Sequence, residues 1–72
     1  MTNQEKIELI EELLEVDEGS LTEDTLLKGL EEWDSIAALT LIAMLDEKFN
    51  RIVSGDEVKA LTTVRDILDY MQ

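Results

Sequence analysis

Apolar residues recur at helical spacing in three separate stretches of this chain, and that periodicity predicts an all-α fold. Thr2 and Glu5 fit a capping box at the start of the first stretch, and Thr63 can cap the last. The chain has no Pro and only three Gly, so little in its composition opposes helix formation. We therefore predict helices over residues 3–16 and 35–49 and a final helix that begins after Thr63.

The connection between the first two predicted helices, residues 20–34, shows no regular period although several of its residues are apolar. We expect a long loop held down by those side chains, with a short helical turn around residues 25–30. Ser54 and Glu57 form a second possible capping box, which predicts a short third helix that ends near Leu61. The expected architecture is a small four-helix bundle with a long first loop and a short third helix.

The length of the chain predicts a single domain, residues 1–72, without room for a second domain that carries a deep cleft. The absence of Cys and His removes disulfides, thiol nucleophiles, imidazole bases and the usual zinc ligands. We therefore expect no metal site and no enzymatic activity. Carboxylates such as Glu31 and Asp34 could form an acid/base pair, but nothing in the sequence predicts an enclosed pocket that would tune their pKa values.

The charge of the chain indicates basic protein partners. Eighteen acidic residues outnumber six basic ones, which gives a net charge of −12. Residues 1–34 hold 12 acids and two bases, so this part alone carries −10. Such a charge repels nucleic acid and anionic membranes. The apolar run over residues 36–45 is also shorter than the roughly 20 residues of a membrane span. We expect a monomer, without membrane insertion, and a cytoplasmic location because the first residues do not resemble a signal peptide.

The helix predicted over residues 35–49 is apolar on two sides, which is more than one core-facing stripe requires. One side suits the core and carries Ala38, Leu41, Ile42, Leu45 and Phe49. Ile36, Leu39 and Ala43 fall roughly opposite. For Ile36 and Ala43 we favour an exposed surface that contacts another protein. Leu39 can equally pack beneath the long loop, against the apolar side chains of that loop.

Ser35 stands at the predicted start of this helix, where free backbone N–H groups and the positive end of the helix dipole favour a phosphate. A phosphodiester on the Ser35 hydroxyl would be favourably placed. The alternative is that Ser35, or Asp34 before it, simply caps the helix. A tripeptide of Asp, Ser and an aliphatic residue arises often by chance, so its position at the helix start is what supports modification.

In this acidic four-helix chain, Asp34-Ser35-Ile36 opens a helix after a long first loop, and the combination resembles an acyl carrier protein. The resemblance extends over residues 13–16, 39–49, 61–66 and 67–71. It implies that a phosphopantetheinyl transferase esterifies Ser35 with 4′-phosphopantetheine taken from coenzyme A. The thiol of that arm would carry acyl groups as thioesters between enzymes.

The resemblance also implies roles for the neighbours of Ser35. In the family, the Asp before the Ser supports modification and the aliphatic residue after it contacts partner enzymes, which are the positions of Asp34 and Ile36. Leu39 and Ala43 would extend this contact surface to acyl-transferring and condensing enzymes. Four acids that flank the modified position are expected to steer the basic surfaces of these enzymes: Glu31, Glu32, Asp46 and Glu47.

Two departures from the fatty-acid carriers bear on the pathway. Those carriers usually have a Gly three residues before the modified Ser, where this chain has Glu32, and acids in the turns after it, where this chain has Ala37, Ala38 and Thr40. A specialised carrier, for example for polyketides, is thus at least as well supported as a fatty-acid carrier. The alternatives are a peptidyl or aminoacyl carrier and an acidic helical interaction module without a prosthetic group.

Fatty-acid carriers can hold an acyl chain among their helices, so the resemblance raises the question of a cavity in this chain. Our hypothesis is a similar cavity beneath the helix of residues 35–49. Its lining would be Leu41, Ile42, Leu45, Leu61 and Leu68. A solid core is the equally supported alternative.

Overall fold

The computed structural model describes residues 1–71, and its regular secondary structure is helical apart from one isolated bridge between Leu26 and Thr63. The elements in chain order are α1 (Asn3–Leu14), the 3-10 helix η1 (Leu27–Gly29), α2 (Ser35–Phe49), α3 (Gly55–Lys59) and α4 (Val64–Tyr70). The four α-helices of residues 1–71 confirm the predicted all-α fold with a long first loop and a short third helix. None of these helices is long and apolar enough to cross a membrane.

Three of the four α-helices begin with capping boxes; the sequence predicts the boxes at Thr2 and Ser54, and at Thr63 it predicts the cap alone. The side chains of Thr2, Ser54 and Thr63 each accept a hydrogen bond from the backbone N–H three residues further on. In return, an acidic side chain at that third position accepts from the backbone N–H of the cap: Glu5, Glu57 and Asp66. Because both partners lie within one helical turn, these helix starts are specified locally.

The predicted helix ends were less accurate than the starts. α1 ends at Leu14 and not at residue 16, because Glu15 adopts a left-handed conformation (φ 59°, ψ 39°). The Val16 N–H then donates to the Glu11 carbonyl at 3.0 Å. Val16 therefore fits the apolar spacing of the helix in the sequence but lies outside the helix in the structure. α3 ends at Lys59, two residues before the predicted Leu61, whose N–H makes a tighter, 3-10 type bond to the Val58 carbonyl.

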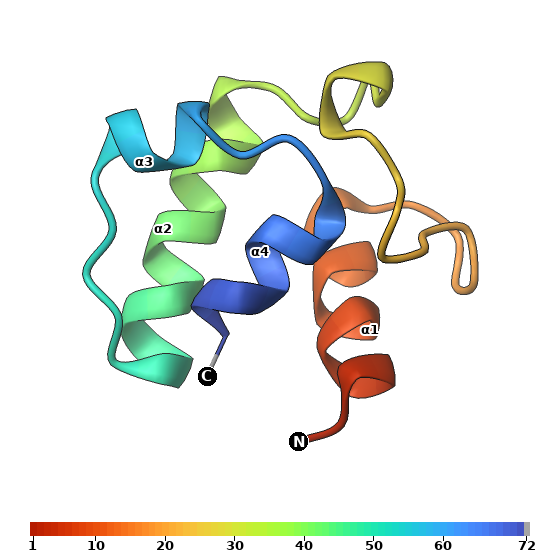
Figure 1. Cartoon of the computed structure of the whole chain (residues 1–72), viewed down its shortest axis with the longest axis horizontal. Helices are drawn as coiled ribbons and strands as arrows, with labels where there is room; N and C mark the ends of the chain where they lie inside the picture. Colours follow the sequence, from red (N-terminus) through yellow and green to blue (C-terminus); the bar gives the residue numbers. More distant parts are fainter. Residues whose placement is uncertain (72) are drawn as a thin grey trace.

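The arrangement of the helices places the start of α2 at one end of the bundle, beside other elements. Figure 1 shows α1 and α2 running in opposite directions, with α4 between them in this view and α3 beside the first turns of α2. α2 packs against both α1 and α3, and α1 packs against α4. The end of α1, the start of α2 and α3 therefore lie at the same end of the bundle (Figure 1).

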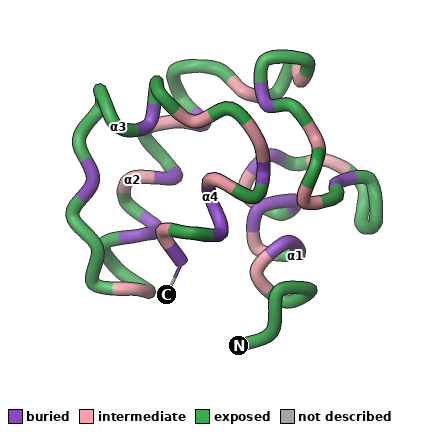
Figure 2. The backbone as a smooth tube through the Cα atoms, viewed as in Figure 1, coloured by how far each residue is buried: buried purple, intermediate pink, exposed green. Residues whose placement is uncertain are grey.

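The core draws on every helix and on the long loop, as the distribution of buried segments in Figure 2 shows. On α2, Leu41 and Leu45 are buried as predicted, but three predicted core residues are only half-buried: Ala38, Ile42 and Phe49. Ala37 and Met44 are buried instead. The core-facing side of α2 is thus rotated from the prediction, because α1 packs against it as well as α3.

The loop of residues 15–34 is fastened to Thr62 and to the first residues of α4. The Leu27 N–H donates to the Thr62 carbonyl at 2.9 Å, and the Val64 N–H donates to the Thr25 carbonyl at 3.1 Å. The Arg65 guanidinium lies 3.0 Å from the Asp24 carboxylate. These contacts explain how a long irregular segment is held in place in a bundle of this size.

Glu11 fastens the other half of the same loop. Its side chain is only 2% exposed although it lies on α1 among solvent-facing acids. One carboxylate oxygen, Oε2, accepts from the backbone N–H groups of Gly19 at 2.9 Å and Leu21 at 3.1 Å. Nothing in the helical pattern of the sequence distinguishes Glu11 from the other acids of α1, so its role was not predicted.

Candidate functional site

Asp34, and not Ser35, caps α2. The backbone of Asp34 is extended, and its Oδ1 accepts a hydrogen bond from the Ala37 N–H at 2.9 Å. Ser35 is therefore the first helical residue, and its side chain does not act as the cap. The Ser35 residue is exposed, and its hydroxyl makes no hydrogen bond within residues 1–71. The side chain is consequently free of a structural task at the helix start.

The start of α2 offers donors next to that hydroxyl. The N–H groups of Ala37 and Ala38 both bond to Asp34, whereas those of Ser35 and Ile36 have no acceptor in the described part of the chain. Free N–H groups at the first turn of a 15-residue helix, together with the helix dipole, stabilise an anion. The geometry suits a phosphodiester on Ser35.

A pocket of about 470 Å³ opens beside Ser35, between the first turns of α2 and α3. Its lining comprises Trp33, Asp34, Ser35, Ala38, Leu39, Ile42, Gly55, Val58 and Lys59. Trp33, whose environment the sequence does not reveal, is half-buried: it packs against the core and forms part of this wall. The contributions of Val58 and Lys59 were missed by sequence reasoning, because only the folding of α3 onto α2 brings them near Ser35.

The hypothetical cavity beneath α2 is not formed as predicted. Leu41 and Leu45 are 1% and 0% exposed in the closely packed core, and Leu68 is also buried. Ile42 lines the pocket beside Ser35, whereas Leu61 lines a separate one. The five side chains face different surroundings because α2 is rotated so that Ile42 points toward α3, away from the core centre.

The predicted contact residues on α2 are exposed. Ile36 is 74% exposed and Leu39 is 67% exposed, and Ala43 also faces solvent. The alternative burial of Leu39 beneath the loop is therefore wrong. The four predicted steering acids are exposed as well, but they form two groups: Glu31 and Glu32 before the helix, and Asp46 and Glu47 in its last turns. Asp46 lies eleven positions after Ser35 in the helix, a distance of about 16 Å along the axis.

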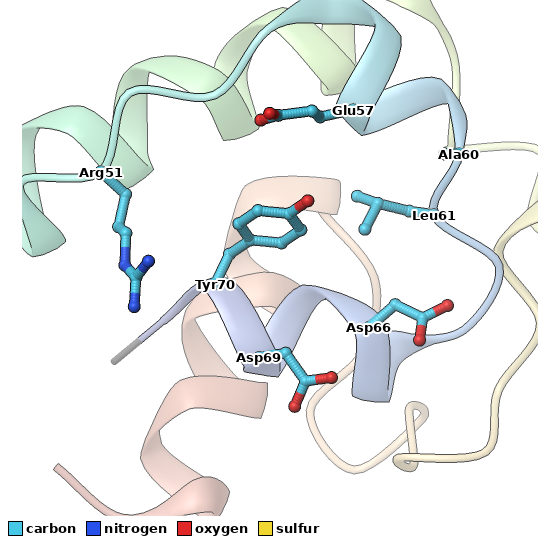
Figure 3. A pocket seen from close by; sticks show the side chains of 7 residues that line it. All are labelled: Arg51, Glu57, Ala60, Leu61, Asp66, Asp69 and Tyr70. Carbon is cyan, nitrogen blue, oxygen red and sulfur yellow. The ribbon is translucent and has the colours of Figure 1, made fainter.

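A second pocket, of about 400 Å³, lies between α4 and the segment that includes α3 (Figure 3). It is lined by Arg51, Glu57, Tyr70 and Asp66 among others, and Ser35 is not part of it. Glu57 and Asp66 already serve as helix caps, and the backbone N–H groups of Thr62 and Thr63 lower the pKa of the Asp66 carboxyl. The described residues contain no group of three or more acids, His or Cys placed to hold a metal ion.

Comparisons with known proteins show the family to which the chain belongs. The family described as "Phosphopantetheine attachment site" matches residues 7–71, from α1 to the end of α4. The acyl carrier protein of Lactobacillus acidophilus is 32% identical over 65 residues, which cover 90% of this chain and 81% of that protein. No solved structure gives a significant match. The chain therefore belongs to the acyl carrier protein family, whose members are carriers and not enzymes and use a 4′-phosphopantetheine prosthetic group.

Proposed function

We propose that Ser35 is the attachment point of the prosthetic group, and that the chain delivers acyl groups to enzymes of fatty-acid, polyketide or related specialised biosynthesis. One observation carries this proposal: the Ser35 hydroxyl is exposed and unbonded at the first residue of α2, because Asp34 performs the capping. A serine needed as a helix cap would lose that hydrogen bond on modification, whereas Ser35 loses nothing.

The residues around Ser35 fit the group that the family carries. The backbone N–H groups of Ser35 and Ile36 would hold the phosphate, and Lys59 adds a positive charge to the wall of the adjoining pocket. The apolar side chains of Trp33 and Leu39 offer a surface for the arm. When bound, the group supplies a thiol on which acyl groups are carried as thioesters.

Exposed apolar side chains on α2 supply the contact surface for partner enzymes. Ile36 and Leu39 lie one helical turn apart, and with Ala43 they form a patch next to Ser35. The acids at both ends of α2 attract basic enzyme surfaces, which raises association rates at low salt more than it raises affinity. Such brief contacts suit a monomeric carrier that visits a phosphopantetheinyl transferase and then acyl-transferring and condensing enzymes in the cytoplasm.

The first turn of α2 favours a specialised pathway. Ala37 is only 7% exposed and Ala38 is half-buried, so this turn presents small apolar side chains where fatty-acid carriers tend to have exposed acids. An enzyme that docks here meets an apolar surface first and acids at its edge. This arrangement requires partners that are matched to it.

Mass spectrometry tests the attachment site directly. Wild-type chain, Ser35→Ala and Ser20→Ala are incubated with coenzyme A and a promiscuous phosphopantetheinyl transferase, and their intact masses are measured. We expect the wild type and the Ser20→Ala control to gain one 4′-phosphopantetheine group and Ser35→Ala to gain none. Modification of Ser35→Ala, or an unmodified wild type with every compatible transferase, would refute the proposal.

The cargo class needs a separate experiment. The modified chain is offered to acyl transferases with acyl-coenzyme A donors and to adenylating enzymes with amino acids and ATP. Loading by the transferases supports an acyl carrier. Loading by the adenylating enzymes alone would identify an aminoacyl carrier with the same arm.

A further inference from the structure

A groove runs along the seam between α1 and α2, separate from the pocket between α2 and α3. It consists of two hollows, of about 450 and 250 Å³. Leu13 and Thr40 line both hollows, so the two are continuous. The larger hollow reaches Asp34 and Ile36 beside Ser35, and the smaller one extends toward Lys48 in the last turn of α2. We refer to this continuous surface as the α1–α2 groove.

The floor of the α1–α2 groove is apolar and open to solvent. Leu9 and Leu13 on α1 are only half-buried, although they pack against the core. Ile36 borders the groove on α2, and 74% of this large apolar residue is exposed to solvent. An apolar side chain of a partner can bury its surface against this floor at the junction of the two helices, which is energetically favourable.

The walls of the α1–α2 groove are acidic. Four carboxylates line it: Glu12, Glu15, Glu32 and Asp34. Lys48 is the one base that lines it, at the end farthest from Ser35. The pocket between α2 and α3 differs in charge, because its single base, Lys59, balances its single acid, Asp34. The α1–α2 groove and the pocket between α2 and α3 therefore present differently charged surfaces on the two sides of Ser35.

We propose that the α1–α2 groove is a docking site for a segment of a partner enzyme in which arginine or lysine side chains flank an apolar residue. The apolar residue packs on Leu9 and Leu13, and the aliphatic stems of the basic side chains cross the floor to reach the carboxylates. A second copy of this chain is a poor occupant, because it brings the same net charge of −12. The identity of the occupant as an enzyme rests on the proposed function at Ser35.

The test uses a synthetic peptide with leucine and arginine at helical spacing and the ¹⁵N-labelled chain without its prosthetic group, near physiological salt. We expect the largest chemical-shift changes at Leu9, Leu13 and Thr40. Thr40→Arg should weaken binding at least tenfold, because it places bulk and positive charge at a residue that lines both hollows. Thr62→Arg makes the same substitution at an exposed position outside the groove, and should weaken binding less than threefold.

Thr40 is a safe site for this substitution, since it is exposed and its hydroxyl only bonds the Ile36 carbonyl of its own helix. The shift map of the wild type is in any case independent of the variants. Three results would overturn the proposal: no binding at millimolar peptide, shift changes centred on Leu39 and Val58, or equal weakening by the two variants. None of them depends on Ser35 modification, so the two proposals fail separately.

Discussion

The Oδ1 atom of Asp34 accepts a hydrogen bond from the Ala37 N–H at 2.9 Å, and this contact decides what the next residue is free to do. Because Asp34 satisfies the orphan donor at the third position of α2, Ser35 contributes only its backbone to the helix. The side chain of Asp34 thus has a structural role, whereas the adjacent Ser35 hydroxyl remains available for modification. The same Asp34 lines both the pocket toward α3 and the groove toward α1.

Removing this cap should destabilise the fold. We expect Asp34→Ala to lower the free energy of unfolding by about 0.5–2 kcal/mol, and Asp34→Asn to lower it much less, because Asn also caps well. Urea titration followed by circular dichroism measures both. Ser35→Ala is the matched control and should leave the free energy of unfolding nearly unchanged. A large loss in Ser35→Ala would show that the hydroxyl has a structural task after all.

Glu11 should be far more important for stability than the other acids of α1. In Glu11→Ala, the N–H groups of Gly19 and Leu21 lose their shared acceptor, and leaving the buried Leu21 donor unpaired costs about 1–3 kcal/mol, whereas water can reach the exposed Gly19. Glu8→Ala, at an exposed position of the same helix, should change stability by no more than a few tenths of a kcal/mol. Hydrogen exchange of the Leu21 amide provides a second measurement: exchange as slow in Glu11→Ala as in the wild type would contradict the proposed anchoring.

Asp66 should make stability depend on pH in the acid range. Backbone hydrogen bonds from Thr62 and Thr63 lower its pKa below the usual 3.8, so the ionised carboxylate stabilises the folded chain. This contribution is complete above about pH 3.8 and is lost as the pH falls through the lowered pKa. The difference in unfolding free energy between wild type and Asp66→Asn should therefore be constant from pH 7 to about 5 and vanish at lower pH.

The matched control for this experiment is Asp69→Asn, which removes the same charge from an exposed position on α4. Its difference from the wild type reports general charge repulsion, which diminishes gradually as the many carboxylates become protonated. If Asp66→Asn and Asp69→Asn gave the same pH profile, the backbone hydrogen bonds to Asp66 would have no specific role.

Added salt should stabilise the chain. At about 0.01 M salt the Debye length of about 30 Å exceeds the longest dimension of the molecule, 27 Å, so its excess acids all repel one another. At about 0.1 M the length falls to about 10 Å and distant repulsions are screened. The melting temperature should rise over this range, and rise less in a Glu8→Gln, Glu12→Gln, Glu15→Gln variant with a charge of −9 in place of −12. A melting temperature that stays flat or falls as salt is added would show that repulsion among the acids does not significantly destabilise the fold.

Much of the local structure follows from the sequence because its causes are local. The capping boxes at Thr2, Ser54 and Thr63 each connect residues three positions apart, and α2 begins and ends where its pattern predicts. The position of Ser35 at a helix start, and hence its suitability for a phosphate, is likewise a property of a short stretch of chain. Within one turn, side chain and backbone meet whatever the rest of the molecule does.

The surroundings of Ser35 depend on packing between segments that are distant in the sequence. Glu11 bonds to Leu21, ten positions further along the chain, and Lys59 reaches the pocket of Ser35 only because α3 folds back onto α2. The rotation of α2, which buries Ala37 and exposes Leu39, results from simultaneous contact with α1 and α3. A periodic pattern shows that a helix has an apolar face, but the choice between two apolar faces is made by the neighbouring helices that cover one and leave the other in water.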